Sequence, residues 1–160
     1  MARILIVDDE PDIRLAIRTA LRLHGHEVAE AQDGPAALAA LEGEKPGLVL
    51  LDIRLPGMDG IEVLGRIRGI SRSLPVVMMT GYGHIHSAAG VAELGADGYL
   101  QKPFGAPELA ETVGRFASGE RAAPSAGKPS RPAEEDRRGR AFSAAALLLV
   151  LSAALLLLFR

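Results

Sequence analysis

Short apolar runs alternate with helix-like segments five times in about the first 118 residues, and this alternation constrains the fold more than any other feature. A strand that carries apolar residues on both faces is typical of a parallel sheet covered by helices on both sides. The alternation therefore predicts a doubly wound α/β domain with a five-stranded parallel sheet. We expect the strands at residues 3–7, 26–31, 47–52, 74–80 and 97–101.

The segments between these runs carry the spacing and the end signals of helices. Ile13, Ile17 and Leu21 recur at helical spacing, and Gly25 follows where a helix is expected to stop. Pro35 falls in the first turn of the next helix, where a missing backbone N–H costs nothing. We expect helices at residues 9–25, 33–43, 61–69, 84–95 and 106–118.

The composition changes after the last of these helices. Residues 119–140 hold three prolines, three glycines and ten charged residues without apolar periodicity, so we expect a disordered linker. Residues 141–159 carry no charge and are long enough for a transmembrane helix. Basic residues lie mainly before this segment, which predicts that the domain at residues 1–118 faces the cytoplasm from the inner membrane. A helix that packs on the domain or on a second copy is the alternative.

Composition excludes several classes of function. The chain has no cysteine, which excludes disulfide scaffolds, thiolate zinc sites and cysteine catalysis. The net charge of −2 gives no global field that favours nucleic acid. The residues after 118 are too few for a typical helix-turn-helix domain, so we expect output through protein contacts.

Polar residues follow the predicted strands at the edge where doubly wound sheets bind ligands. Asp8 and Asp9 follow the first strand, Asp52 ends the third, Thr80 ends the fourth, and Lys102 follows the fifth. If the first and third strands are neighbours, three carboxylates converge there and raise one another's pKa. A hard divalent cation removes this conflict, and Mg²⁺ fits best because it also accepts phosphate oxygens.

The same residues suggest a phosphoryl site. Lys102 supplies a second positive charge, Thr80 supplies a hydroxyl, and the carboxylate of Asp52 is a nucleophile. The stretches "ILIVDDEPDIR", "LVLLDIRLPGMDGIEVL", "VVMMTGYG" and "GADGYLQKPF" resemble the receiver domain of bacterial two-component response regulators. The resemblance covers about residues 2–118 and implies a flavodoxin-like fold with strand order 2-1-3-4-5.

The resemblance also implies roles for individual residues. Asp52 is then the phosphoacceptor, and Asp9 and Asp52 hold Mg²⁺ together with the backbone carbonyl of Arg54, while Asp8 acts through water. Thr80 is then a contact of the phosphoryl oxygens.

Three further positions follow from the resemblance. Lys102 then also contacts the phosphoryl oxygens, Tyr99 is the switch aromatic, and the Lys102–Pro103 peptide bond is cis. Arg54 and Tyr82 stand where this family modulates the lifetime of the phosphoryl group.

The resulting hypothesis is a signalling switch that turns over no external substrate. A sensor histidine kinase or phosphotransfer protein donates the phosphoryl group, and the changed surface then binds a downstream protein. One alternative is an interaction module that works without phosphorylation, and another is a small Mg²⁺-dependent phosphohydrolase. His84 and His86 start a predicted helix but do not share a helical face, so we expect them to be solvated.

Overall fold

The computed structural model describes residues 1–43, 45–81, 93 and 95–117 of the 160-residue chain. By its internal contacts the chain divides into two units, Met1–Ser125 and Ala126–Arg160, and all described residues belong to the first unit. The fold and the site below are those of this first unit.

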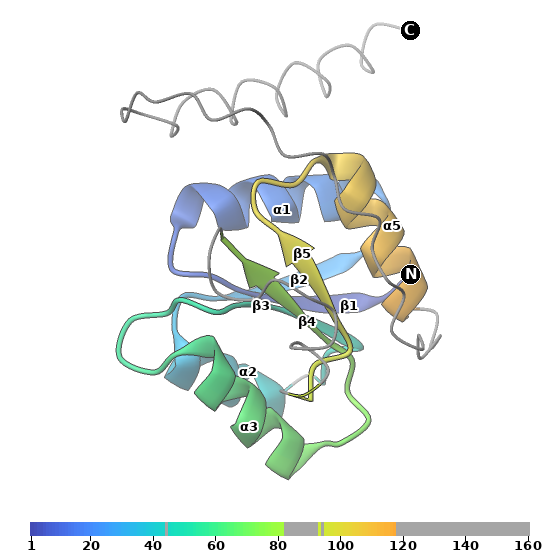
Figure 1. Cartoon of the computed structure of the whole chain (residues 1–160). Helices are drawn as coiled ribbons and strands as arrows, with labels where there is room; N and C mark the ends of the chain where they lie inside the picture. Colours follow the sequence, from blue (N-terminus) through green and yellow to red (C-terminus); the bar gives the residue numbers. More distant parts are fainter. Residues whose placement is uncertain (44, 82–92, 94, 118–160) are drawn as a thin grey trace, which may run out of the picture. The chain divides into compact units, whose positions relative to one another are not determined.

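The described strands form one parallel sheet in the order β2-β1-β3-β4-β5, which confirms the predicted topology (Figure 1). Strands one and three are neighbours, with Val7 paired to Leu51. This pairing is the condition on which the predicted convergence of acids depends. The strands are β1 (Arg3–Val7), β2 (Glu27–Ala31), β3 (Leu48–Asp52), β4 (Val76–Thr80) and β5 (Gly98–Gln101).

Helices cover both faces of the sheet, as the apolar strands predict. Figure 1 shows α1 and α5 on one face and α2 and α3 on the other. Each boundary lies within two residues of the sequence-based expectation for these four helices. Their bounds are α1 (Pro11–Leu23), α2 (Gly34–Glu42), α3 (Gly60–Ile70) and α5 (Ala106–Ala117).

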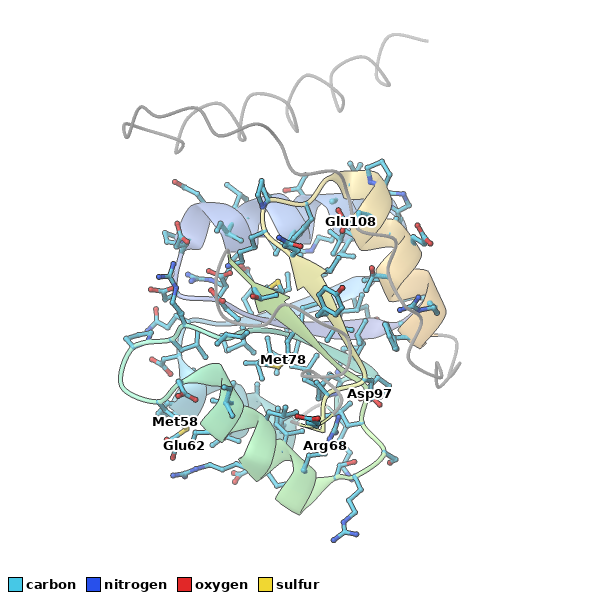
Figure 2. The ribbon with its side chains drawn as sticks, viewed as in Figure 1. Met58, Glu62, Arg68, Met78, Asp97 and Glu108 are labelled. Carbon is cyan, nitrogen blue, oxygen red and sulfur yellow. The ribbon has the colours of Figure 1, made fainter. Side chains whose placement is uncertain are left out.

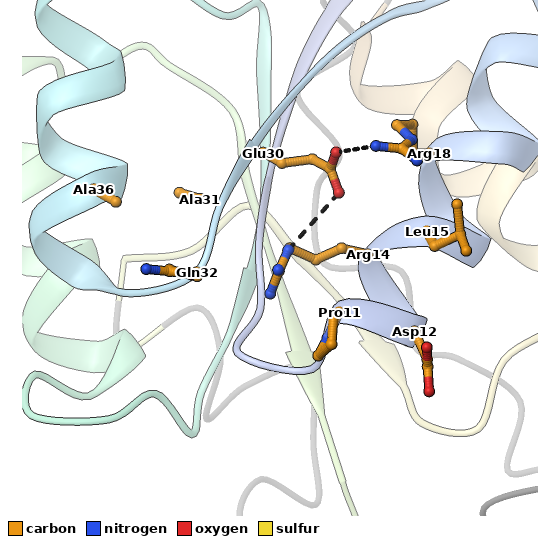
Figure 3. A pocket seen from close by; sticks show the side chains of 9 residues that line it. All are labelled: Pro11, Asp12, Arg14, Leu15, Arg18, Glu30, Ala31, Gln32 and Ala36. Carbon is orange, nitrogen blue, oxygen red and sulfur yellow. Dashed lines mark hydrogen bonds and ion pairs between the residues drawn. The ribbon is translucent and has the colours of Figure 1, made fainter.

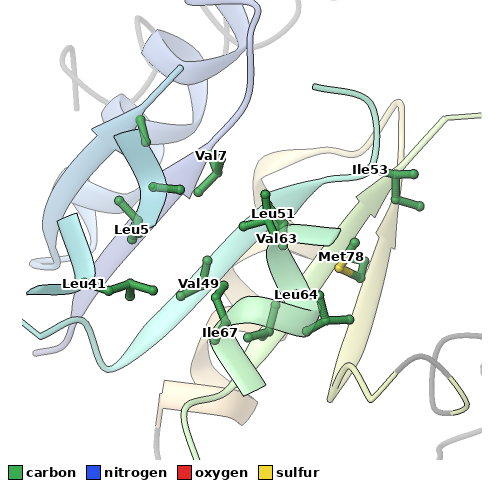
Figure 4. Close-up of a cluster of buried hydrophobic side chains, with 13 residues drawn as sticks. Leu5, Val7, Leu41, Val49, Leu51, Ile53, Val63, Leu64, Ile67 and Met78 are labelled. Carbon is green, nitrogen blue, oxygen red and sulfur yellow. The ribbon is translucent and has the colours of Figure 1, made fainter. Parts of the chain in front are cut away.

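The core is split into two layers by the sheet, because successive side chains of a strand point to opposite faces. Leu5 and Val7 of β1 pack with α2 and α3, in the cluster that Figure 4 shows. Ile4 and Ile6 of the same strand pack with residues of α1 and α5. All four side chains are buried, so β1 stabilises both layers at once.

The helix ends follow from local side-chain chemistry. After α1, Gly25 has a φ of 77°, and the amides of Gly25 and His26 donate to carbonyls of the last turn, which is a Schellman motif. Asp33 caps α2 by accepting from the Ala36 amide at 2.8 Å. Asp59 caps α3 by accepting from the Glu62 amide at 2.8 Å.

An arginine clasp fixes the edge of the sheet opposite the predicted acids. The Arg68 guanidinium donates to the carboxylate of Asp97 and to the carbonyls of Gly95 and Leu74, each at 2.7 Å (Figure 2). The same Asp97 oxygen accepts from the amide of Val76 at 2.8 Å. The clasp therefore ties the end of α3 to the starts of β4 and β5.

Several sequence-based predictions fall outside the described residues. These are the helix at 84–95 with His84 and His86, the linker at 119–140 and the transmembrane helix at 141–159. Within the described part of the chain, none of the helices has the length and apolar character needed to cross a lipid bilayer.

Candidate functional site

Two aspartates lie side by side at the carboxyl edge of the sheet. Asp52 is the last residue of β3, and Asp8 directly follows the last residue of β1. The parallel pairing of Val7 with Leu51 brings these strand ends next to each other. Asp8 has no exposed surface and Asp52 is 6% exposed, so both carboxylates are withdrawn from bulk water.

Lys102 bridges the two aspartates. Its ammonium nitrogen Nζ donates to Oδ2 of Asp8 at 2.6 Å and to Oδ2 of Asp52 at 2.8 Å. The two carboxylate oxygens therefore lie no further apart than the sum of these distances. Buried carboxylates are costly unless they are paired and hydrogen-bonded, and one lysine pairs with both here. Three of the residues predicted from the sequence are thus in direct contact.

Burial and the bridge act in opposite directions on the pKa of both Asp8 and Lys102. Burial raises the pKa of the Asp8 carboxyl above its ordinary value, although the hydrogen bond from Lys102 opposes this. Burial alone lowers the pKa of Lys102, but its hydrogen bonds to Asp52 and Asp8 outweigh burial and raise it. Lys102 is therefore an ammonium throughout the physiological range.

Further carboxylates adjoin this pair. Asp8, Asp9 and Glu10 each offer an oxygen, and these oxygens lie within 4.8 Å of one another. Asp9 and Glu10 are exposed, so this end of the cluster is open to solvent. Asp52 accepts from the backbone amide of Arg54 at 3.3 Å. Clustered carboxylate oxygens are the donors that a hard cation such as Mg²⁺ prefers, so the residues fit that ion.

Thr80, the predicted phosphoryl contact at the end of β4, is hydrogen-bonded to its neighbours through its hydroxyl and its carbonyl. Thr80 is buried, and its hydroxyl donates to the carbonyl of Gly81 at 2.9 Å. Its own carbonyl accepts from the amide of Lys102 at 2.7 Å. The Lys102–Pro103 peptide bond is cis, which confirms that expectation.

The predicted switch residue lies one strand further along the sheet. Tyr99 is partly buried on β5 and packs against the cluster of α2 and α3. It pairs with Met78 across the strands. Tyr99 is therefore on the opposite face of the sheet from α5.

Sequence inspection missed Gly60, which fixes the loop after Asp52. A Cβ atom at Gly60 meets the carbonyl oxygen of Asp52 at 2.0 Å, far below any real contact. The Gly60 amide also donates to the carbonyl of Ile53 at 2.7 Å. Only glycine permits this approach of α3 to the end of β3. No local sequence pattern indicates this contact.

Both a family model and individual proteins of known sequence match this chain. The Response regulator receiver domain family matches residues 4–114. Sporulation initiation phosphotransferase F of Bacillus subtilis is 39% identical over 114 residues, which are 71% of this chain and 92% of that protein. The response regulator protein FleR of Pseudomonas aeruginosa is 41% identical over 119 residues, which are 74% of this chain but only 25% of FleR.

A solved structure agrees with both sequence matches. The receiver domain of NtrX from Brucella abortus superposes with a TM-score of 0.68 at 41% identity, covering 72% of this chain and 98% of that domain. The family match at residues 4–114 spans both the acids and the lysine.

Proposed function

This chain belongs to the response regulator receiver domain family, and we propose that Asp52 accepts a phosphoryl group in a two-component pathway. The observation that carries the proposal is the bridge of Lys102 to both Asp8 and Asp52 at the carboxyl edge of the sheet. A buried carboxylate next to a fixed ammonium and further acids is a nucleophile in a site suited to phosphoryl transfer.

The donor is a phosphohistidine on a sensor histidine kinase or on a phosphotransfer protein. An oxygen of Asp52 attacks phosphorus in line, the bond from phosphorus to the imidazole nitrogen breaks, and that nitrogen keeps the electron pair. The product is an acyl phosphate on Asp52, which water later hydrolyses. The chain therefore acts as a switch and turns over no external substrate.

Asp8, Asp9 and Asp52, with the backbone carbonyl of Arg54, are the residues that hold Mg²⁺ in this proposal. When bound, Mg²⁺ offsets the negative charge of the phosphoryl oxygens. Lys102 supplies a second positive charge to the same oxygens.

Two residues pass the change on to the surface. Thr80 gives up its hydrogen bond to the Gly81 carbonyl and donates to the phosphoryl group. Tyr99 then changes its packing, which alters the affinity of the surface for a downstream protein. This is a local change of charge that biases a two-state element.

A small phosphodonor tests the assignment without any partner protein. The full-length chain is incubated with acetyl phosphate and Mg²⁺, and the intact mass is followed with time. Wild type gains one phosphoryl group, Asp52→Asn gains none, and the exposed Asp12→Asn variant behaves as wild type. Incorporation into Asp52→Asn at the normal rate overturns the assignment. An unmodified wild type supports the phosphorylation-independent module, and release of many equivalents of phosphate supports the hydrolase.

Residues 141–159 form, in the same proposal, a transmembrane helix that tethers the receiver to the cytoplasmic face of the inner membrane. Nineteen uncharged residues at ~1.5 Å per residue match the hydrocarbon thickness. The linker at 119–140 then leaves the receiver free to meet a membrane kinase at raised effective concentration.

Fractionation tests the tether separately from the phosphorylation. The full-length chain is expected in the membrane fraction after a carbonate wash, whereas a chain truncated after Gly119 is expected in the supernatant. Release of the full-length chain by carbonate or high salt refutes the tether and leaves the assignment of Asp52 untouched.

A further inference from the structure

Every polar group of Asp8 is hydrogen-bonded. Its amide donates to the carbonyl of Ala31 at 3.2 Å, and its Oδ1 accepts from the amide of Glu10 at 2.9 Å. Its Oδ2 accepts from Lys102 at 2.6 Å, and its backbone carbonyl accepts from Nη1 of Arg14, also at 2.6 Å. Among these four hydrogen bonds, only the one from Arg14 joins a side chain to the backbone of Asp8.

The hydrogen bond from Arg14 fixes more than Asp8. The carbonyl of Asp8 and the amide of Asp9 belong to one planar peptide unit. Holding that carbonyl sets the direction in which the chain leaves the buried Asp8 for the exposed Asp9. Asp8 and Asp9 are two of the three aspartates proposed to bind the cation. They are therefore oriented relative to each other by a guanidinium that contacts neither of their carboxylates in the described hydrogen bonds.

Arg14 is itself held in place. Its Nε lies 3.8 Å from Oε1 of Glu30 on β2, and Arg18 donates to the other oxygen of Glu30 at 2.6 Å. These residues line a cleft between α1 and the end of β2, which Figure 3 shows. The Arg14 side chain is only 16% exposed, so little water competes for its donors. Glu30 thus lies near Nε of Arg14, while Nη1 of the same guanidinium donates to Asp8.

We propose that Arg14 is a positioning residue for the cation site, acting through the Asp8 carbonyl, with Glu30 as its support. The inference rests on the proposed function, in which Asp8 and Asp9 hold Mg²⁺. It gives a role to Arg14 and Glu30, two residues that the proposed function does not use.

The sign of the effect separates positioning from simple electrostatics. A guanidinium repels a cation, so Coulomb's law alone predicts that Mg²⁺ binds more tightly when Arg14 is replaced by a neutral residue. Loss of positioning predicts weaker binding, because the Asp8 carbonyl then loses the hydrogen bond that fixes the direction of the Asp8–Asp9 peptide. A metal site held by second-layer hydrogen bonds loses on the order of 10–100-fold in affinity when they are removed.

Calorimetric titration of the full-length chain with MgCl₂ in a non-ionic detergent tests the inference. Arg14→Met is expected to weaken Mg²⁺ binding about tenfold. Arg14→Lys keeps the positive charge and a hydrogen-bond donor, so it is expected to lose less Mg²⁺ affinity than Arg14→Met. Arg18→Met is the matched control, because Arg18 shares Glu30 but makes no described contact with Asp8, and it is expected to bind as wild type.

Each outcome decides the question. Equal or tighter binding by Arg14→Met overturns the inference while leaving the proposed function standing. A wild type that takes up no Mg²⁺ overturns both. If Arg14→Met does not fold, Glu30→Gln and Arg14→Lys decide, since affinities equal to wild type in both refute the positioning role. The ¹³C resonance of the Asp8 carbonyl, measured without metal, is expected to move in Arg14→Met and not in Arg18→Met.

Discussion

Replacing Lys102 by methionine isolates the electrostatic role of the bridge. Methionine keeps most of the apolar stem and removes the ammonium that both Asp8 and Asp52 accept from. Two carboxylates then face each other at the edge of the sheet, one of them without any exposed surface. Removing one partner of a buried ion pair typically costs about 3–5 kcal/mol of folding free energy.

Protonation sets an upper limit on the part of this loss that comes from repulsion between the two carboxylates. When the unpaired charges cost too much, the variant takes up a proton on one carboxyl group, as coupled acids do. Protonating an aspartate of ordinary pKa costs about 1.4 kcal/mol per pH unit above that pKa, which is roughly 5 kcal/mol at pH 7.5 and roughly 2 kcal/mol at pH 5.5. The part of the loss in Lys102→Met that comes from the two facing charges is therefore expected to be about 3–5 kcal/mol at pH 7.5 and no more than about 2 kcal/mol at pH 5.5.

The direction of the pH dependence follows from the linkage of proton binding to folding. Asp8 already has a raised pKa in the folded wild type, and removal of Lys102 raises it further. An acid whose pKa is higher in the folded state stabilises the fold at low pH, and this contribution is lost as the pH rises through the folded pKa. The difference in stability between wild type and Lys102→Met is thus expected to shrink as the pH falls.

Urea unfolding followed by circular dichroism at the two pH values measures the loss. Lys45→Met, at an exposed lysine, is the control and is expected to stay within about 0.5 kcal/mol of wild type. Adding Asp52→Asn to Lys102→Met removes one of the facing charges and is expected to restore most of the stability at pH 7.5. An equal loss at both pH values refutes the reasoning, because a packing defect has no such pH dependence.

Three other predictions concern stability. Gly60→Ala is expected to lower the free energy of unfolding by more than about 3 kcal/mol, because its Cβ meets a backbone oxygen at 2.0 Å. Gly65→Ala in the same helix has open space around it and is expected to raise the free energy of unfolding by about 0.5–1 kcal/mol. Urea unfolding compares the two variants. Arg68→Met is expected to cost about 2–4 kcal/mol, and Arg66→Met, which loses one exposed pair, less than about 0.5 kcal/mol in the same assay. The pKa of Lys102 is raised in the folded state, so its contribution to the free energy of unfolding is expected to persist up to the ordinary lysine pKa and to fall only above it. Urea unfolding of wild type at rising alkaline pH is expected to show this loss, and the same measurement on Lys102→Met is expected not to show it.

The fold was predictable because its signals are local. Gly25 follows a helical pattern, and the structure places it with a φ of 77° in the cap after α1. Ile4, Leu5, Ile6 and Val7 form an unbroken apolar run, and all four are buried on the two faces of β1. The strand order came from the resemblance to receiver domains, because the residue pattern alone left open whether β1 and β3 are neighbours.

The details of the site were less predictable because they depend on contacts between distant residues. Arg68 and Asp97 are 29 positions apart, and no local pattern connects them. Arg14 is only six positions from Asp8, but the contact is made to a backbone carbonyl, which every residue carries. Gly60 shows its role only when a Cβ is placed against the end of β3.

The choice of lysine at position 102 follows from the order of the strands. Neighbouring strands lie about 4.8 Å apart, so the end of β5 is separated by roughly two strand spacings from β3 and three from β1. A cation that touches Asp52 and Asp8 from β5 must therefore cross the end of β4, which a four-carbon stem with a compact ammonium is able to do. Thr80 ends β4 with a small side chain and gives its backbone carbonyl to the amide of Lys102, so it anchors the lysine at its base. In the proposed reaction the ammonium then already lies against Asp52 before the phosphoryl group arrives, and little side-chain entropy remains to be lost in the transfer step.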